Sequence, residues 1–263
     1  MALAALGICA CAPTSHQVNI PLAEAHDLST FLSDRDTAIH SMQTSALMEY
    51  AGGGQHFKAR ENIIVVRPAS LRVEVMSALG VALVVAADAG QVAVFDPNRN
   101  TLMQGSANPA TLQRFARIPM TPDAAVRLML ALAPDSAMLA FPPNSMTVNG
   151  DARVLNYRQP GGAVDELGFN GAGDLETVRE TLANGRISYE VHYIGYAKVD
   201  GDYSFPAEVD ASFPQTGATV KFHYQNPIVN KDVPDSAFVL QPGPGTRKLN
   251  LGMDTVTTND ARS

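Results

Sequence analysis

Residues 187–193, Ile-Ser-Tyr-Glu-Val-His-Tyr, decide the fold class. Apolar and polar side chains alternate with a period of two, so the apolar ones share one face of an extended strand. Residues 220–224, Val-Lys-Phe-His-Tyr, repeat this pattern. Strands of this kind build antiparallel sheets that have one apolar face, and that face must be covered.

Further strand-like segments lie on both sides of these two stretches, and short runs rich in turn-forming residues separate them. These runs are Gly52-Gly53-Gly54, Pro68, Gly80, Asp88-Ala89-Gly90 and Asp96-Pro97-Asn98. Short connections indicate that consecutive strands pair as antiparallel neighbours. The glycine triplet predicts a hairpin turn rather than a phosphate loop, because no Gly-Lys-Ser/Thr pattern follows it.

Only about three helices accompany roughly eleven or more strands. Helical spacing predicts the first over residues 22–41 and a short second one over 109–116. The third begins with Thr121 as its N-cap and Pro122 at its first position, and it ends before Pro134. The pattern therefore predicts a mainly β (α+β) domain over residues 22–241. We expect a strongly curved antiparallel sheet that forms an open or half β-barrel with a helical lid. Residues 242–263 are expected to be a flexible tail.

Composition excludes several classes of function. A formal net charge of −7 over 263 residues argues against nucleic-acid binding and against a polybasic membrane patch. The two cysteines are Cys9 and Cys11, so the body of the chain holds no disulfide, cysteine-ligated zinc or catalytic thiol.

The N-terminus predicts export and lipidation. Residues 1–10 are apolar and match the end of a signal peptide, and Ile8-Cys9-Ala10-Cys11 matches a lipobox. We expect Cys11 to carry the lipid and residues 11–21 to be a tether. No Asp follows Cys11, which favours the outer membrane, with the domain facing the periplasm. An ordinary apolar N-terminus or a cleaved signal of a soluble protein is the alternative.

Segments over most of residues 25–240 resemble the LolA/LolB lipoprotein-carrier family, especially its outer-membrane, lipid-anchored branch. They are Arg67-Pro68-x-x-Leu71-Arg72-Val73-Glu74, Ser77-Ala78-Leu79-Gly80, 90–97, Ala116-Arg117-Ile118-Pro119-Met120 before the 127–132 helix, 189–196 and Phe205-Pro206-Ala207-Glu208-Val209. The order and spacing of these segments carry the resemblance. This chain departs from the family in lacking tryptophan, in extra sequence near Gly161-Gly162 and in its long C-terminal tail.

The resemblance implies a half-barrel whose lid encloses an apolar cavity for lipoprotein acyl chains or phospholipid. It also implies an exposed apolar side chain on a loop between early strands, which here would be Leu79; an ordinary core leucine is the alternative. The candidates for the cavity and lid are Arg72, Met120, Leu128, Met129 and Leu132. The methionines could instead fill the core, and Arg72 could be an exposed strand arginine rather than a partner of a headgroup or a lid carbonyl. A periplasmic carrier protein is a further candidate partner.

Enzyme signatures are missing from the sequence. It contains no Gly-x-Ser-x-Gly elbow and no His-Glu-x-x-His pair. His192 and His223 fall on outward strand positions, where they are either neighbours able to hold a metal or solvated surface histidines. The pairs Asp34/Asp36 and Asp165/Glu166 are interpreted as surface carboxylates. We therefore predict a non-enzymatic protein without cofactor that binds acyl chains, the alternative being a scaffold lipoprotein of an envelope complex.

Overall fold

The computed structural model describes residues 22–88, 90–199 and 203–251. The signal-like segment, Cys11 and the tether lie outside these residues. None of the described helices is long and apolar enough to cross a membrane.

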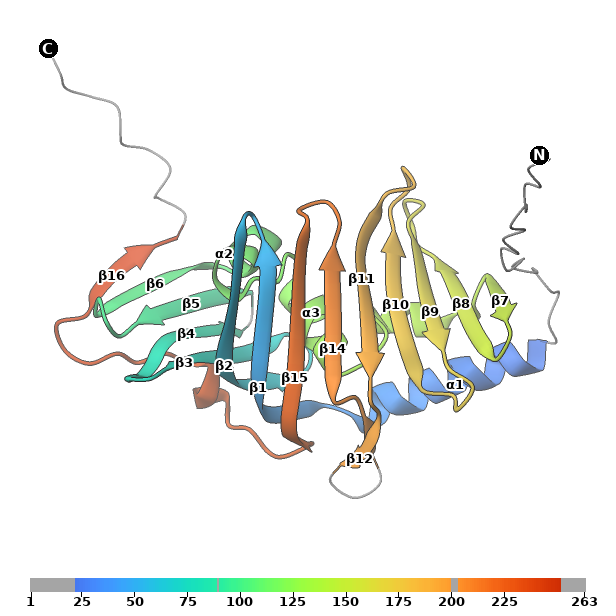
Figure 1. The fold of residues 1–263 in the computed structure, drawn as a ribbon, viewed down its shortest axis with the longest axis horizontal. Helices are drawn as coiled ribbons and strands as arrows, with labels where there is room; N and C mark the ends of the chain where they lie inside the picture. The colour runs from blue at the N-terminus through green and yellow to red at the C-terminus, as the bar shows by residue number, and fades with distance from the viewer. Residues whose placement is uncertain (1–21, 89, 200–202, 252–263) are drawn as a thin grey trace, which may run out of the picture.

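One sheet of 14 strands makes up most of the molecule (Figure 1). Its order across the sheet is β16 (Arg247–Asn250), β6 (Thr101–Ser106), β5 (Gln91–Asp96), β4 (Gly80–Asp88), β3 (Ser70–Ser77), β2 (Gln55–Val66), β1 (Ser41–Gly52), β15 (Ala218–Val229), β14 (Glu208–Phe213), β11 (Ile187–Ile194), β10 (Leu175–Thr181), β9 (Val164–Phe169), β8 (Ala152–Arg158) and β7 (Ser145–Asn149). All neighbours are antiparallel except β16, which pairs parallel with β6. A separate hairpin joins β12 (Ala197–Val199) to β13 (Tyr203–Phe205).

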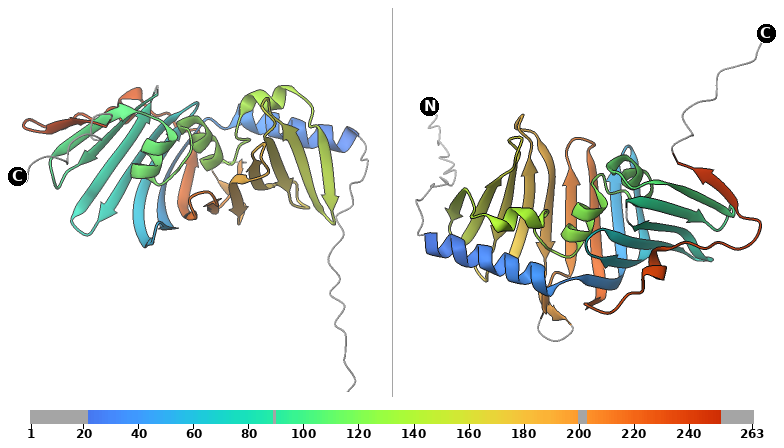
Figure 2. Two further views of the ribbon diagram at one scale, coloured as in Figure 1. Left: turned by 90° about the horizontal axis from the view of Figure 1, so that it is seen from above. Right: turned by 180° about the vertical axis from the view of Figure 1, so that it is seen from behind.

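The sheet is curved and open, and the helices lie on its concave face (Figure 2). They are α1 (Leu22–Ala38), α2 (Pro109–Ala116), α3 (Pro122–Met129) and the short 3-10 turn η1 (Ser136–Ala140). A second 3-10 turn, η2 (Asp235–Phe238), packs against β3 and β4. The predicted half-barrel with a helical lid is confirmed.

The alternation in the sequence explains which face is covered. In β11, Tyr189, Val191 and Tyr193 are buried while His192 is exposed. Strands β1 and β2 are joined by a two-residue turn in which Gly53 and Gly54 have φ values of 57° and 74°. Positive φ at both positions is the geometry of a type I′ hairpin, which glycine adopts without steric cost.

Two boundaries differ from the prediction. The first helix ends at Ala38 instead of residue 41, because Ser41 already pairs with Val66 in the sheet. Within the expected flexible tail, Arg247–Asn250 forms β16 instead, since its backbone pairs with the edge of β6. An unpaired strand edge offers a row of free backbone groups, and β16 satisfies those of β6. Residues 252–263 lie outside the described part of the chain.

Candidate functional site

Helix α3 is the lid helix over the concave face (Figure 2). It begins as predicted: the Thr121 side chain accepts a hydrogen bond from the Ala124 amide at 3.4 Å, and Pro122 occupies the first turn. Ala125, Val126, Leu128 and Met129 are buried, so the helix is apolar on more than one side. The following residues 130–133 are buried as well.

Buried side chains from the sheet and from α1 bind the carbonyls at the C-terminal end of the lid helix. The last carbonyls of a helix have no partner within it and must find one elsewhere. Tyr193 donates its hydroxyl to Leu128 O at 2.9 Å, and Tyr224 donates to Met129 O at 3.2 Å. Arg35 Nε donates to Ala131 O at 2.9 Å. Burial raises the pKa of Tyr193 well above its ordinary value, so the phenol stays protonated and remains a donor.

A charged cluster joins the lid helix to α1 and to the turn that follows β2. Asp36 pairs with Arg67 at 2.9 Å through one carboxylate oxygen and with the buried Arg127 through the other. Arg127 Nε also donates to Ala133 O at 2.6 Å. The prediction that Asp36 is an ordinary surface carboxylate was therefore wrong. A buried guanidinium needs a charged partner, and Asp36 provides it.

A small apolar cavity of about 30 Å³ lies beneath the lid helix. Met120, Leu128 and Met129 line it, opposite side chains of β11, β14 and β15 such as Val191 and Phe222. Leu132 is buried but does not line this cavity. The volume corresponds to about one water molecule, far below the roughly 300–1,000 Å³ of ordinary ligand sites.

Arg72 does not point into the concave side. It alternates with Leu71 and Val73, which are buried on that side, so its own side chain extends from the outer face. There it pairs with Glu74 at 2.6 Å and donates to Ala237 O of η2 at 2.8 Å. The interpretation of Arg72 as a cavity or lid residue is corrected accordingly.

Leu79 lies at the tip of the β3–β4 hairpin and is 98% exposed. The Ser77 hydroxyl accepts from the Leu79 amide at 3.2 Å and donates to Gly80 O at 2.9 Å. These two contacts define the loop while leaving the leucine side chain in solvent. The alternative of a core leucine is thereby removed.

Two carboxyl groups are buried on the concave side, and the sequence reading missed both. Glu61 is 5% exposed and Asp165 is fully buried. Loss of water raises the pKa of Glu61 to about 8 and that of Asp165 to about 6. The signal was available for Glu61: it shares the apolar alternation of Phe57, Ala59 and Ile63 in β2. The interpretation of Asp165 as a surface carboxylate was wrong, because it shares the inward face with Leu167.

A wider, open groove of about 700 Å³ lies at the η1 end of the molecule. Met138, Phe141 and Pro142 form its apolar wall, while Tyr157 and Gln159 lie on the opposite side. Phe141 is 69% exposed. This groove is large enough for a ligand without any change in the fold.

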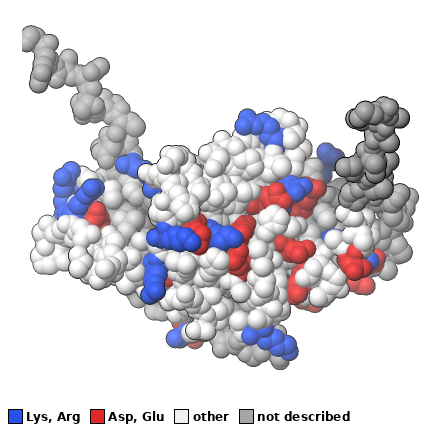
Figure 3. Space-filling view, in the orientation of Figure 1, with Lys and Arg blue, Asp and Glu red and all other residues white. Residues whose placement is uncertain are grey.

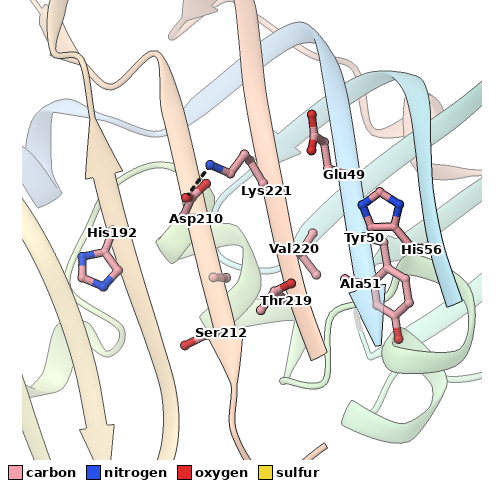
Figure 4. A pocket seen from close by; sticks show the side chains of 11 residues that line it. Glu49, Tyr50, Ala51, His56, His192, Asp210, Ser212, Thr219, Val220 and Lys221 are labelled. Atoms are coloured by element: carbon pink, nitrogen blue, oxygen red, sulfur yellow. Dashed lines mark ion pairs between the residues drawn. The ribbon is translucent and has the colours of Figure 1, made fainter. Parts of the chain in front are cut away.

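The convex face carries a hollow of about 380 Å³ across β11, β14, β15, β1 and β2 (Figure 4). Asp210 and Lys221 point toward each other in it at 2.7 Å, with His192 on one side and His56 on the other. Acidic and basic side chains gather over the middle of this face (Figure 3). Their charges compensate one another, which leaves a polar surface of mixed sign.

The histidine pair considered from the sequence does not form a metal site. His192 and His223 lie on β11 and β15, which β14 separates, and each pairs with a carboxylate: Glu190 at 3.2 Å and Glu208 at 2.7 Å. Among the residues that the structure describes, no group of three or more His, Cys, Asp or Glu side chains could hold a metal ion.

Comparison with known proteins gives structural neighbours only. No protein-family model matches the chain, and no curated protein matches its sequence. A DUF1329 family protein from Desulfovibrio piger superposes with a TM-score of 0.57 at 13% identity, covering 83% of this chain and 97% of that one. A LolA superfamily protein from Nitrosomonas europaea gives a TM-score of 0.55 at 12% identity, covering 81% and 97%. The fold of this chain is therefore that of the LolA/LolB-like proteins, as the resemblance in sequence implied.

Proposed function

We propose that this chain is an outer-membrane lipoprotein that faces the periplasm and binds acyl chains beneath its lid helix. The ligand would be a lipoprotein acyl chain or a phospholipid, with a role in lipoprotein or lipid localisation. The observation that carries the proposal is the lid helix itself, which covers a wholly apolar part of the concave face and leaves a small apolar cavity there. In this reading Cys11 holds the anchor and the chain needs neither catalytic residue nor cofactor.

Physical chemistry explains why such a protein is needed. Exposing an acyl chain of about sixteen methylenes to water costs roughly 0.8 kcal/mol for each methylene, about 13 kcal/mol in all. A carrier or acceptor therefore has to supply a dry apolar surface. Flexible methionine side chains such as Met120 and Met129 can adapt such a surface to chains of different shape.

An acyl chain enters only when the lid helix moves outward, because the present cavity has room for about one water molecule. Two neutral tyrosine hydrogen bonds bind the C-terminal carbonyls of the lid helix and contribute about 1 kcal/mol each, and the charged donor Arg35 contributes about 1.5–3 kcal/mol. The Arg127–Asp36 ion pair also links the lid helix to α1, so the lid would open together with this pair or break it.

Leu79 supports a membrane-facing role for the β3–β4 hairpin. Its side chain is almost fully exposed on a loop defined by Ser77, and a lone apolar tip of this kind can enter a lipid surface at little structural cost. The hairpin and the start of α1 lie at opposite ends of the long axis (Figure 1). A tether of eleven residues spans at most about 40 Å, so it limits how the anchored domain can orient its Leu79 tip toward the same membrane.

A scaffold role is the second candidate, and the small volume of the cavity favours it. A lipoprotein with a packed interior would use this fold only to present surfaces to partners in an envelope complex. The polar hollow on the convex face is such a surface.

Native mass spectrometry on the chain purified gently from a bacterial envelope separates the two candidates. We expect a co-purifying acylated species that is lost in Leu128→Asn, because Leu128 lines the cavity. Leu112→Asn is the matched control: it also introduces a polar group at a fully buried leucine, in α2 and away from the cavity lining. A ligand-free mass for the parent chain, which also refuses added fatty acid, would contradict acyl binding and leave the scaffold.

A further inference from the structure

Glu61 is an acidic residue in an otherwise apolar position. On β2 it shares the concave face with Ala59 and Ile63, and its direct cross-strand neighbours are Ala46 on β1 and Val75 on β3. The lid helix packs over β2 and β3 from above. The carboxyl is therefore surrounded by apolar groups from its own sheet.

Among the residues that the structure describes, none forms a hydrogen bond or an ion pair with the Glu61 carboxyl, and burial alone shifts its pKa. The residue is only 5% exposed, yet neither carboxyl oxygen is among the fully buried polar atoms that lack a partner, so the oxygens remain reachable from outside. Burial of a polar group without a protein partner is costly, and an isosteric apolar side chain would avoid this cost. The carboxyl can therefore contact a molecule that is not part of the described chain.

The burial of Glu61 also sets its chemistry. Desolvation raises the pKa of this carboxyl to about 8, so at neutral pH it is mostly protonated and carries an O–H donor. A neutral acid binds a hydrogen-bond acceptor and does not require a counter-ion. This favours a neutral carbonyl over a cation.

The register places Glu61 within reach of the acyl site. Glu61 pairs with Ala46, and Ala46 pairs with Tyr224 on β15, the strand that also contributes Val220 and Phe222 to the cavity. Two strand spacings separate Glu61 from that strand, about 10 Å. A ligand that laid its hydrocarbon chain in an opened cavity could therefore bring a polar head to β2 under the same lid.

We propose that Glu61 is the polar anchor of the acyl-chain site, where its carboxyl O–H donates a hydrogen bond to the carbonyl oxygen of an acyl ester or amide. This inference rests on the proposed acyl-binding function and adds to it the ligand class. Glycerolipids supply the ester, and the acylated N-terminus of a lipoprotein supplies both an ester and an amide. A hydrocarbon without a carbonyl would bind the apolar surface alone.

A matched pair of ligands tests the proposal on the full-length chain carrying Cys11→Ser. 1-Palmitoylglycerol has the ester carbonyl, and 1-O-hexadecylglycerol has the same length and head with an ether in its place. Binding is measured by displacement of a fluorescent apolar reporter. We expect the parent chain to prefer the ester by about fivefold, the value of one neutral hydrogen bond. Glu61→Leu should abolish this preference while it retains binding of the ether, and Glu61→Gln, which keeps an N–H donor, should preserve it.

The outcomes separate this inference from the function on which it rests. If neither glycerol compound displaces the reporter from the parent chain, acyl binding itself fails. If both bind but Glu61→Leu keeps the ester preference, or if the parent chain shows none, the anchor is wrong and acyl binding stands. A peptide palmitoylated on its N-terminal amine extends the test: a larger Glu61-dependent affinity for it than for the glycerol ester identifies a lipoprotein as the source, and the reverse identifies a glycerolipid. Thermal unfolding of each variant confirms that the chain is folded.

Discussion

The middle of the concave face and its η1 end are covered in different ways, although one continuous sheet forms both. Beneath the lid helix the covering is apolar and close, and the remaining space is about 30 Å³. At the η1 end the five-residue turn η1 and helix α1 cover the sheet less completely and leave a groove of about 700 Å³. The covering segments, and not the sheet, therefore decide how much room each part of the face offers.

The two buried carboxyl groups, Glu61 and Asp165, also differ between these two parts of the concave face. Glu61 lies on β2 beneath the lid helix among apolar side chains, and only loss of water shifts its pKa. Asp165 lies toward the η1 end, where Gln159 donates a hydrogen bond to one of its oxygens. This hydrogen bond offsets part of the rise in pKa that burial causes. The other oxygen of Asp165 is fully buried without a partner, whereas neither oxygen of Glu61 is, so Glu61 is the carboxyl that a ligand can reach.

The largest expected effect is on stability, from Glu61→Gln. The carboxyl has a pKa of about 8 when folded and 4.5 when unfolded. Below pH 4.5 it is protonated in both states; above that, unfolding releases a proton, so the free energy of unfolding falls as the pH rises toward 8. At roughly 1.4 kcal/mol per pKa unit the fall is about 5 kcal/mol. Urea unfolding should be measured from pH 4 to 9. The free energy of unfolding of the glutamine variant should be higher than that of the parent chain at pH 8, and it should change less with pH. A parallel profile for the two proteins would contradict the burial of Glu61.

Asp165→Asn should give a smaller effect in a lower pH window. Its pKa is about 6 when folded and 3.8 when unfolded, so the free energy of unfolding falls by about 3 kcal/mol between pH 3.8 and 6. The asparagine variant should lose this fall while it retains the one that Glu61 causes at higher pH. The same urea series measures it. If both variants lost the fall over the same pH range, the two carboxyls would not differ in the way described above.

Tyr193→Phe should cost about 1 kcal/mol and loosen the lid helix specifically, because it removes the donor to Leu128 O. Hydrogen exchange should rise in the amides of residues 125–130. Tyr157→Phe is the control at the other end: it removes a hydrogen bond of 3.1 Å to Ser29 of α1, at similar cost. If both variants change exchange in the lid helix equally, Tyr193 has no particular role in holding it.

Local pattern predicted much of the fold, and the failures have physical reasons. The caps Thr121 and Pro122, the Gly53-Gly54 hairpin and the alternation in β11 are properties of neighbouring residues, so the sequence shows them directly. Alternation with Leu71 and Val73 also predicts the face that Arg72 occupies. The resemblance to the LolA/LolB family predicted the opposite face.

Other features depend on contacts between distant segments. Asp36 is half-buried and paired because Arg67, in the turn after β2, and Arg127, on the lid helix, converge on it. Strand β16 exists because β6 presents an unpaired edge, and no pattern within Arg247–Asn250 alone requires it. The volume under the lid is set by packing among four separate elements. Such quantities have no local signal, so the sequence could suggest a cavity but could not give its size.

The smallest effect on stability, and the sharpest test of which end meets the membrane, comes from the two exposed apolar tips. Leu79→Glu on the β3–β4 hairpin and Phe141→Glu beside η1 each replace a side chain that is mostly in solvent, so the free energy of unfolding should change by less than about 0.5 kcal/mol in both. Binding of the Cys11→Ser chain to neutral phospholipid vesicles should nevertheless weaken about tenfold for Leu79→Glu, because a leucine that enters lipid gains roughly 1.5–3 kcal/mol when fully buried. Phe141→Glu should leave vesicle binding unchanged. The reverse result would assign membrane contact to the open groove at the η1 end, and Leu79 would then have no part in delivering a ligand.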